Sequence, residues 1–215
     1  MSPPLVIAVD GPAASGKGTI ASGLAALYGL PHLDTGLLYR AVGVAVLAAG
    51  GRLDDEAGAA KIAASLDLAR LDHPEYRTRE AGEAASQVAV HPAVRLALLK
   101  MQQDFARRPG GAVIDGRDIG TVIAPDAVAK LFVTATPEVR AERRWKQLTG
   151  QGESVSMAEV LEDIRLRDAR DSGRGAAPLT QADDAVLLDT SQESIESAAD
   201  AARRIVEAAR IRSNG

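Results

Sequence analysis

Cysteine is absent from the 215-residue sequence, which excludes disulfides and metal sites built on thiolates. Histidine is scarce, and His32, His73 and His91 lack the spacing of metal ligands, so we interpret each as a surface or capping residue. No apolar run is long enough to span a membrane. The amino-terminal segment MSPPLVIAVD also lacks the basic region and the apolar length of a signal peptide. We therefore expect a cytoplasmic protein without a membrane partner.

The sequence also has no excess of positively charged residues. The formal net charge is −4, whereas general nucleic-acid binding depends on a basic surface. We therefore expect no nucleic-acid partner, and any anion that the protein binds must meet local positive charge. The composition, with 46% hydrophobic and 25% charged residues, is typical of a globular unit with a packed core. Nothing in it suggests more than a monomer.

The clearest motif that is present is LVIAVDGPAASGKGT, from Leu5 to Thr19. Its apolar start is typical of a strand buried in a parallel sheet. The G-x-x-x-x-G-K pattern that follows is typical of a phosphate-binding loop, because glycines let backbone N–H groups approach the anion and Lys17 adds a positive charge. Gly18 directly follows the lysine, so the hydroxyl that could meet Mg²⁺ falls on Thr19. The alternative is an ordinary glycine-rich turn between a strand and a helix.

Further apolar runs alternate with stretches of helical spacing. Residues that recur every three or four positions are typical of the buried face of a helix. This alternation predicts an α/β protein in which a parallel sheet is covered by helices on both faces. The expected strands are Leu5–Val9, His32–Leu33, Ala112–Ile114, Leu131–Ala135 and Ala185–Leu188, and the clearest helical stretches are Val94–Phe105, Met157–Ile164 and Ile195–Ala209.

Two regions depart from the alternation. Between about 50 and 92 the chain is alanine-rich, charged and weakly periodic, with a turn at Leu71–Thr78, and we interpret it as an insertion. From Gly150 to Pro178 a helix is followed by a segment rich in arginine. Ordered segments rarely gather so many like charges without an anion, so we expect a mobile flap there.

Aspartates follow two of the expected strands. Asp10 ends the first, and Asp115 ends the strand in AVIDGRDIGT. Ligands of an open parallel sheet lie beyond the carboxyl ends of its strands, so both aspartates should lie beside the phosphate loop. Asp115 is then a candidate for orienting the water ligands of Mg²⁺. Its alternative role is to cap the turn that begins at Gly116.

Arg117 and Asp118 come next and carry opposite charges. The planar fork of an arginine can grip a phosphate, and a carboxylate can accept a hydrogen bond from the exocyclic amine of a base. Together they predict recognition of a nucleotide. The alternative is a salt bridge between two turn residues.

The segment HLDTGLLYRAV follows the second expected strand. We expect Thr35 to cap a helix. Tyr39 and Arg40 lie one turn further, where a substrate could reach them. Capping of the helix alone accounts for Thr35 as well as a role in substrate binding does.

The flap contains Arg167, Arg170 and Arg174. Their spacing by three and four residues places them on one face of a helix. Opposite a phosphate loop they would neutralise a phosphoryl group in transit. The alternative is a solvated face on which they pair with nearby aspartates.

In combination, these motifs resemble those of the nucleoside monophosphate kinases, and among them the bacterial cytidylate kinases. The resemblance covers nearly the whole chain and accounts for Gly18, because this group uses the form G-K-G-T. It implies a single P-loop kinase domain over residues 1–215, with a five-stranded parallel sheet, an insertion that binds the nucleoside monophosphate at about 35–95 and a lid at about 150–178. The motifs are GPAASGKGT, LDTGLLYR, ASQVAVHPAVR, DGRDIGT, RAERRWKQL, RDARDSGRGAAPL and ADDAVLLDTS.

The resemblance implies transfer of the γ-phosphoryl group of ATP to CMP or dCMP, with Mg²⁺ as cofactor. The attacking phosphate oxygen is already ionised near neutral pH, so alignment and charge neutralisation would carry the reaction without a general base. Asp118 would accept a hydrogen bond from N4 of cytosine and repel O4 of uracil.

The resemblance also implies a role for individual residues. The catalytic residues would be Lys17, Arg117, Arg167 and Arg174, and Mg²⁺ would be held by Thr19 and Asp115, directly or through water. ATP would bind to Gly11, Pro12, Ala13, Ala14, Ser15, Gly16, Lys17, Gly18, Thr19 and Arg143, although an ordinary exposed helix arginine is the alternative for Arg143. CMP would bind to Thr35, Tyr39, Arg40, Ser86, Arg95, Arg117, Asp118, Arg167, Asp171 and Arg174.

Other functions remain open at this point. A kinase of the same fold could use AMP, UMP or shikimate as the acceptor. A GTP-dependent switch would need an N-K-x-D motif, but the only asparagine is Asn214.

Overall fold

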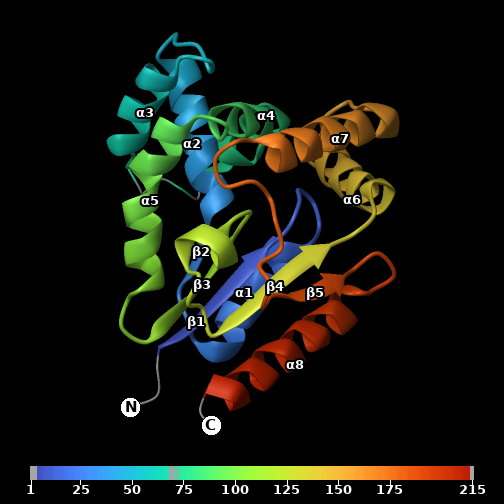
Figure 1. The fold of residues 1–215 in the computed structure, drawn as a ribbon. Coiled ribbons are helices and arrows are strands. Elements are labelled where there is room, and N and C mark those ends of the chain that lie inside the picture. Colours follow the sequence, from blue (N-terminus) through green and yellow to red (C-terminus); the bar gives the residue numbers. More distant parts are fainter. Residues whose placement is uncertain (1–3, 68–70, 72, 214–215) are drawn as a thin grey trace.

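A computed structural model describes residues 4–67, 71 and 73–213. Five strands form one parallel sheet in the order β2-β3-β1-β4-β5 (Figure 1). The predicted α/β class is confirmed, and every predicted strand boundary lies within two residues of the observed one. The strands are β1 (Leu5–Asp10), β2 (His32–Asp34), β3 (Gly111–Gly116), β4 (Ala129–Thr134) and β5 (Val186–Asp189).

Helices cover both faces of the sheet, as predicted. Successive side chains of β1 alternate between the faces, so Ile7 and Val9 pack with α1 and α8 whereas Ala8 packs on the opposite side. The helices are α1 (Lys17–Tyr28), α2 (Thr35–Ala48), α3 (Glu56–Ala64), α4 (Arg79–Val88), α5 (Pro92–Ala106), α6 (Pro137–Gly150), α7 (Met157–Gly173) and α8 (Ile195–Ser213), with short helical turns η2 (Pro74–Arg77) and η3 (Ile119–Ile123). None of the helices within the described ranges is long and apolar enough to cross a membrane.

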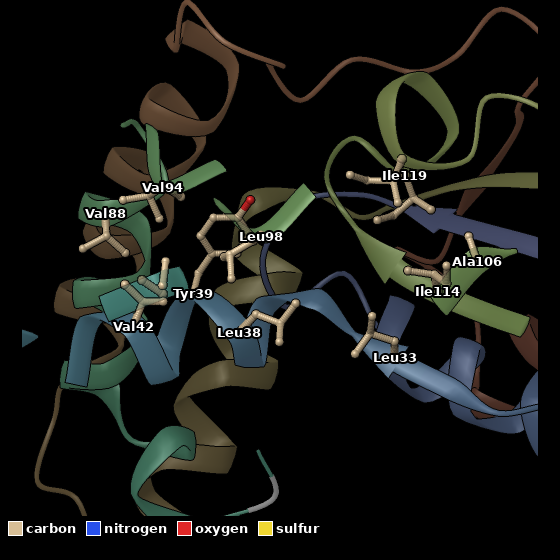
Figure 2. Close-up of a cluster of buried hydrophobic side chains, with 14 of the residues drawn as sticks. Leu33, Leu38, Tyr39, Val42, Val88, Val94, Leu98, Ala106, Ile114 and Ile119 are labelled. Atoms are coloured by element: carbon tan, nitrogen blue, oxygen red, sulfur yellow. The ribbon is translucent and has the colours of Figure 1, made fainter. Parts of the chain in front are cut away.

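The larger hydrophobic cluster joins the sheet to α2, α4 and α5. Figure 2 shows Leu33 and Ile114 from the strands in one cluster with Leu38 from α2, Val88 from α4 and Leu98 from α5. Full burial of one such side chain stabilises the fold by about 2 kcal/mol. The helices that follow β2 are therefore held to the sheet by a shared core.

The predicted insertion and flap lie beyond the carboxyl ends of the central strands. Helices α2 to α5 form one group and α6 with α7 form another (Figure 1). The weakly periodic region folds into α3, η2 and α4, and the predicted turn at Leu71–Thr78 contains η2; residues 68–70 and Asp72 lie outside the described part of the chain. The flap is mainly α7, which begins with a capping box at Ser156.

Candidate active site

The phosphate loop between β1 and α1 has an unusual backbone. Gly11 has φ 152°, and a Cβ atom there would lie 2.0 Å from the carbonyl oxygen of Val133, so only glycine fits. Gly16 has φ 90°, and Ala14 has the left-handed value of 58°. A left-handed alanine costs roughly 1–2 kcal/mol and is typical of ligand-binding loops. The loop is therefore shaped against local preference, as expected for a site that brings backbone N–H groups to an anion.

The amino terminus of α1 is the part of this loop with unused hydrogen-bond donors. Gly16 stands at its cap position, so no side chain caps the helix. In contrast, α2 is capped by Asp34 and α7 by Ser156. The first N–H groups of a helix without a cap, together with the helix dipole, favour an anion. The buried hydroxyl of Ser15 also has no hydrogen-bond partner.

Lys17 begins α1 and adds a charge to the same place. Burial and the nearby charge of Arg117 lower its pKa to about 8, although Asp115 and Asp34 act in the opposite direction. The fold therefore keeps this ammonium group partly desolvated beside another cation. A bound polyphosphate would relieve both effects.

Asp10 ends β1 directly before the phosphate loop, and its carboxylate is bonded to the backbone of η3. The carboxylate accepts hydrogen bonds from the backbone N–H groups of Ile119 (2.8 Å) and Gly120 (2.7 Å). Burial raises the pKa of Asp10 to about 6, with these hydrogen bonds acting against that effect. Both oxygens are thus used to hold η3, the turn that follows Asp118, and the role of Asp10 is to shape the backbone.

Asp115 does lie beside the phosphate loop. Its Oδ2 is 4.0 Å from the position that a Cβ atom would take on Gly18, and the side chain of Thr19 is exposed in the adjoining cavity. Across the described residues, no group of three or more metal-ligating side chains gathers. Mg²⁺ usually keeps several waters and uses one or two carboxylates with substrate phosphates. A hydroxyl and a carboxylate beside the loop therefore fit this ion.

His32 is neither a surface residue nor a cap. It is half-buried, and its Nε2 lies 2.8 Å from Oδ1 of Asp115. His91 stands at the cap position of α5, but its ring bonds to the carbonyl oxygen of Leu53 and not to the helix. The prediction was wrong for His32, because its partner lies 83 residues away in the sequence.

Thr35 is also not the cap of α2. Oδ1 of Asp34 accepts the hydrogen bond from the N–H of Gly36 (2.9 Å), and Asp34 has extended backbone angles, so it is the capping residue. Thr35 is the first helical residue, and its hydroxyl donates to the carbonyl oxygen of Asp115 (2.8 Å). β2 ends at Asp34, one residue later than predicted, and α2 begins at Thr35. The capping residue is therefore Asp34 and not Thr35. Thr35 thus ties α2 to β3.

Asp118 and Arg95, two residues predicted to bind CMP, lie in a buried cluster. Nη2 of Arg95 is 2.5 Å from Oδ2 of Asp118, and Nη2 of Arg174 is 3.7 Å from its Oδ1. The guanidinium of Arg95 also lies 5.6 Å from the centre of the Tyr39 ring. Four predicted CMP-binding residues therefore contact one another across four separate segments. The alternative for Arg117 and Asp118 was a salt bridge between the two. Instead, Asp118 pairs with Arg95, and Arg117 pairs with Asp171.

Arg117, Asp171 and Arg167 form a second group. Nε of Arg117 donates to Oδ2 of Asp171 (2.7 Å), while Arg167 lies 3.9 Å from the same oxygen. Burial alone would raise the pKa of Asp171, but the charges of Arg117 and Arg167 hold it below the usual value. Burial and the charge of Arg117 lower the pKa of Arg167 to about 9, and its buried Nε has no hydrogen-bond partner. This group has more positive charge than its single carboxylate can balance.

Ser86 and Arg40 connect the helices around the site. Ser86 is buried and accepts a hydrogen bond from Nη1 of Arg170 (2.9 Å), whose Nη2 bonds to Glu83 (2.7 Å). Arg170 is thereby turned towards α4, away from the solvated face considered for it. Nη1 of Arg40 donates to the backbone carbonyl of Thr78 (3.1 Å). Burial, followed by the charge of Arg144, lowers the pKa of Arg40 to about 10.

Arg143 packs against the outside of the phosphate loop. Its Nη1 donates to the hydroxyl of Thr190 (2.9 Å) and to the carbonyl oxygen of Ser15 (3.4 Å). The side chain is half-buried, so the alternative of an ordinary exposed helix arginine is wrong. Arg143 therefore links α6 to the loop.

A cavity of about 1750 Å³ connects the loop with the two groups of helices. Pockets for one drug-sized ligand measure about 300–1,000 Å³, so this space can hold more than one. Its lining includes loop residues 13–19 together with Asp34, Arg40, Arg144 and Arg167. The predicted residues outside that lining are Asp10, Gly11, Pro12, Thr35, Tyr39, Ser86, Arg95, Asp115, Arg117, Asp118, Arg143, Arg170, Asp171 and Arg174.

Asp34 and Arg144 are site residues that the sequence analysis missed. Asp34 is the last residue of β2, just as Asp115 lies at the end of β3, and the same rule about strand ends would have identified it. Burial and the charge of Asp115 raise its pKa. Arg144 lies one residue after Arg143 in RAERRW, and nothing in that spacing shows which arginine reaches the cavity.

Comparison with known proteins identifies the family. The family model for cytidylate kinase matches residues 7–208. A cytidylate kinase of Caulobacter vibrioides strain NA1000 is 70% identical over 207 residues, which cover 96% of this chain and 97% of that protein. A cytidylate kinase of Xanthobacter autotrophicus is 66% identical over 206 residues, covering 96% and 99%.

A solved structure supports the fold alone. The crystal structure of an uncharacterized protein from Eubacterium ventriosum has a TM-score of 0.55 at 15% identity, covering 94% of this chain and 98% of that one. The phosphate loop, the arginine-lined cavity and the relatives agree, and the chain belongs to the cytidylate kinase family.

Proposed function

We propose how this member of the cytidylate kinase family transfers the γ-phosphoryl group of ATP to CMP or dCMP to form ADP and the nucleoside diphosphate. The phosphate loop, with Lys17, binds the phosphates of ATP. The buried cluster around Asp118 binds the acceptor. Arg167 lies between the two regions and serves the phosphoryl group that is transferred.

One observation carries this proposal: loop residues 13–19 line the same cavity as Arg40 and Arg167. A single polyphosphate would need only the loop. Further arginines across the cavity indicate a second anion that must be brought close to the first. The buried Nε of Arg167 supports this, because it makes no hydrogen bond and lies 3.9 Å from Asp171, and a buried N–H without an acceptor favours an anion.

Recognition of the base is assigned to Asp118, Arg95 and Ser86. Cytosine offers an N4 amine to Asp118, and its N3 and O2 acceptors can take hydrogen bonds from Arg95 and Ser86. Uracil would direct O4 lone pairs at the same carboxylate, which is repulsive. Because Asp118 is paired with Arg95 and Ser86 with Arg170, binding of CMP replaces contacts that these groups already make.

The remaining acceptor contacts concern sugar and phosphate. Asp171 is assigned to the sugar hydroxyls, while Arg40, Arg117, Arg167 and Arg174 hold the acceptor phosphate. Thr35 and Tyr39 are assigned to the same side of the acceptor site. Arg143, which contacts the loop, is assigned to the adenine side of ATP.

The chemistry needs no general base. The attacking phosphate oxygen is ionised near neutral pH, so the residues only have to align it and neutralise charge. Lys17 and Arg167 act on the transferred group, and Arg117 and Arg174 act on the acceptor. Mg²⁺, when bound through Thr19 and Asp115, supplies further neutralisation of the phosphates.

The test is a phosphorylation assay with ATP and a panel of acceptors. CMP and dCMP should be used with a kcat/KM well above that for UMP or AMP. A preference for AMP or UMP would contradict the assignment of Asp118. We also propose that the protein acts as a monomer in the cytoplasm. Sedimentation velocity at the protein concentration of the assay would test whether it is a monomer.

A further inference from the structure

His32 and Asp115 are brought together by the register of two parallel strands. His32 pairs with Val113, and Asp34 pairs with Asp115, so Asp115 is the diagonal neighbour of His32. Side chains alternate along a strand, and both residues stand on the face where Val113 packs with α1, while Leu33 and Ile114 pack on the other. The two side chains therefore lie on the face of the sheet that is covered by α1, the helix that follows the phosphate loop.

The contact between them fixes one oxygen of the carboxylate. Nε2 of His32 lies 2.8 Å from Oδ1 of Asp115, and the side chains are 25% and 2% exposed. An ionised carboxylate can only accept, so the imidazole N–H donates. The other oxygen, Oδ2, lies on the side of Gly18, 4.0 Å from where its Cβ would be. Thr35 fixes the backbone carbonyl of Asp115 as well.

This partner differs from those of the other buried carboxylates of the site. Asp118 and Asp171 are each bonded by an arginine, at 2.5 Å and 2.7 Å. A guanidinium always neutralises its carboxylate, whereas an imidazole can donate the same hydrogen bond in its neutral form. In that form the imidazole leaves the negative charge of its partner available to a cation. Carboxylates that serve a metal are typically oriented by such a hydrogen bond from a neighbouring side chain.

We infer that His32 is a positioning residue, which holds the carboxylate of Asp115 so that its second oxygen serves the Mg²⁺ that accompanies ATP. The inference rests on the proposed function, in which Asp115 contributes to the magnesium site. His32 itself lines the cavity but is assigned no contact with either nucleotide.

The experiment compares four variants by calorimetric titration of Mg²⁺ into the complex of the protein with ADP, with kinetics as a second readout. His32→Leu removes the donor and should weaken Mg²⁺ binding about tenfold. It should lower kcat or raise KM for Mg·ATP and leave KM for CMP unchanged. His32→Gln places an amide N–H near the position of Nε2 and should restore most of the affinity. Asp115→Asn is the reference for loss of the metal ligand.

The matched control is His91→Leu. Nε2 of His91 also makes a 2.8 Å hydrogen bond, to the carbonyl oxygen of Leu53, but no carboxylate beside the loop is involved. This variant should bind Mg²⁺ as the wild type does. Thermal unfolding of each variant checks the fold, and His32→Ala removes the donor without added bulk if the leucine variant does not fold.

The outcomes separate the inference from the proposal beneath it. If Asp115→Asn weakens Mg²⁺ binding and the donor-free variants at 32 do not, His32 does not position the carboxylate. If Asp115→Asn also leaves Mg²⁺ binding unchanged, the magnesium role of Asp115 is wrong and the inference falls with it. Equal loss in His32→Leu and His32→Gln would overturn the role of the hydrogen bond.

Discussion

The phosphate loop and the acceptor cluster are both charged, but they are held in different ways. The loop comes from one continuous segment, and its shape is set by Gly11, the left-handed Ala14 and the uncapped start of α1. The cluster comes from segments far apart in the sequence, and it is held by arginine–carboxylate pairs such as Arg95 with Asp118. The first region depends on backbone geometry and the second on charge balance.

Because of this difference, the two regions should tolerate different substitutions. A backbone site needs glycines and loses little when distant residues change. An ion-paired site is sensitive to every member, because removing one charge leaves another buried without a partner. Substitutions in the two regions should therefore give different combinations of lost activity and lost stability.

Lys17→Ala should have the largest effect, and on activity alone. Because Lys17 lies at the loop and is assigned to ATP, kcat/KM should fall by roughly 10³-fold, while the affinity for CMP, measured by calorimetry, should be largely kept. Lys146→Ala, which removes an exposed lysine paired with Glu142, is the control. A parallel loss of CMP affinity would contradict the division into a loop for ATP and a cluster for CMP.

Arg117→Met should mainly reduce stability. The change leaves the buried Asp171 without its 2.7 Å hydrogen bond, so the free energy of unfolding should fall by about 3 kcal/mol. Denaturant titration measures this value. Arg52→Met, at an exposed pair with Asp54, should leave the midpoint unchanged. A stable Arg117→Met protein would show that charge balance does not hold the cluster.

Asp118→Asn should change selectivity. An amide can donate to O4 of uracil, so the preference for CMP over UMP in kcat/KM should narrow by about tenfold. The loss of the ion pair with Arg95 should also weaken CMP binding. If the ratio of the two kcat/KM values is the same as in the wild type, Asp118 does not read the base.

The smallest effect concerns pH at the loop. The pKa of Lys17 is about 8 in the protein without nucleotide, and bound phosphates raise it, so ATP binding takes up a proton above that pH. Affinity for ATP should therefore fall as the pH rises, by about fourfold between pH 7 and pH 8.5. Calorimetry in buffers of different ionisation heat measures both the affinity and the proton uptake. The Lys17→Ala protein should lack this dependence.

The sheet and the loop could be predicted because their signals are local. Five apolar runs correspond to the five strands, and GPAASGKGT to the loop. The errors came where two neighbouring residues suit the same role: Asp34 and Thr35 are both good caps, and only the exact end of β2 decides between them. Asp10 and Asp115 both end strands, yet one bonds to η3 and the other to His32.

Local chemistry was enough for the class of fold, the phosphate-binding segment and the set of charged residues that could form a site, since periodicity and turn preferences act over a few positions. The choice of partners came only with the folded chain. Which arginine pairs with Asp118, and that a histidine bonds to Asp115, depends on strand order and helix packing, because these bring residues tens of positions apart to within hydrogen-bond distance.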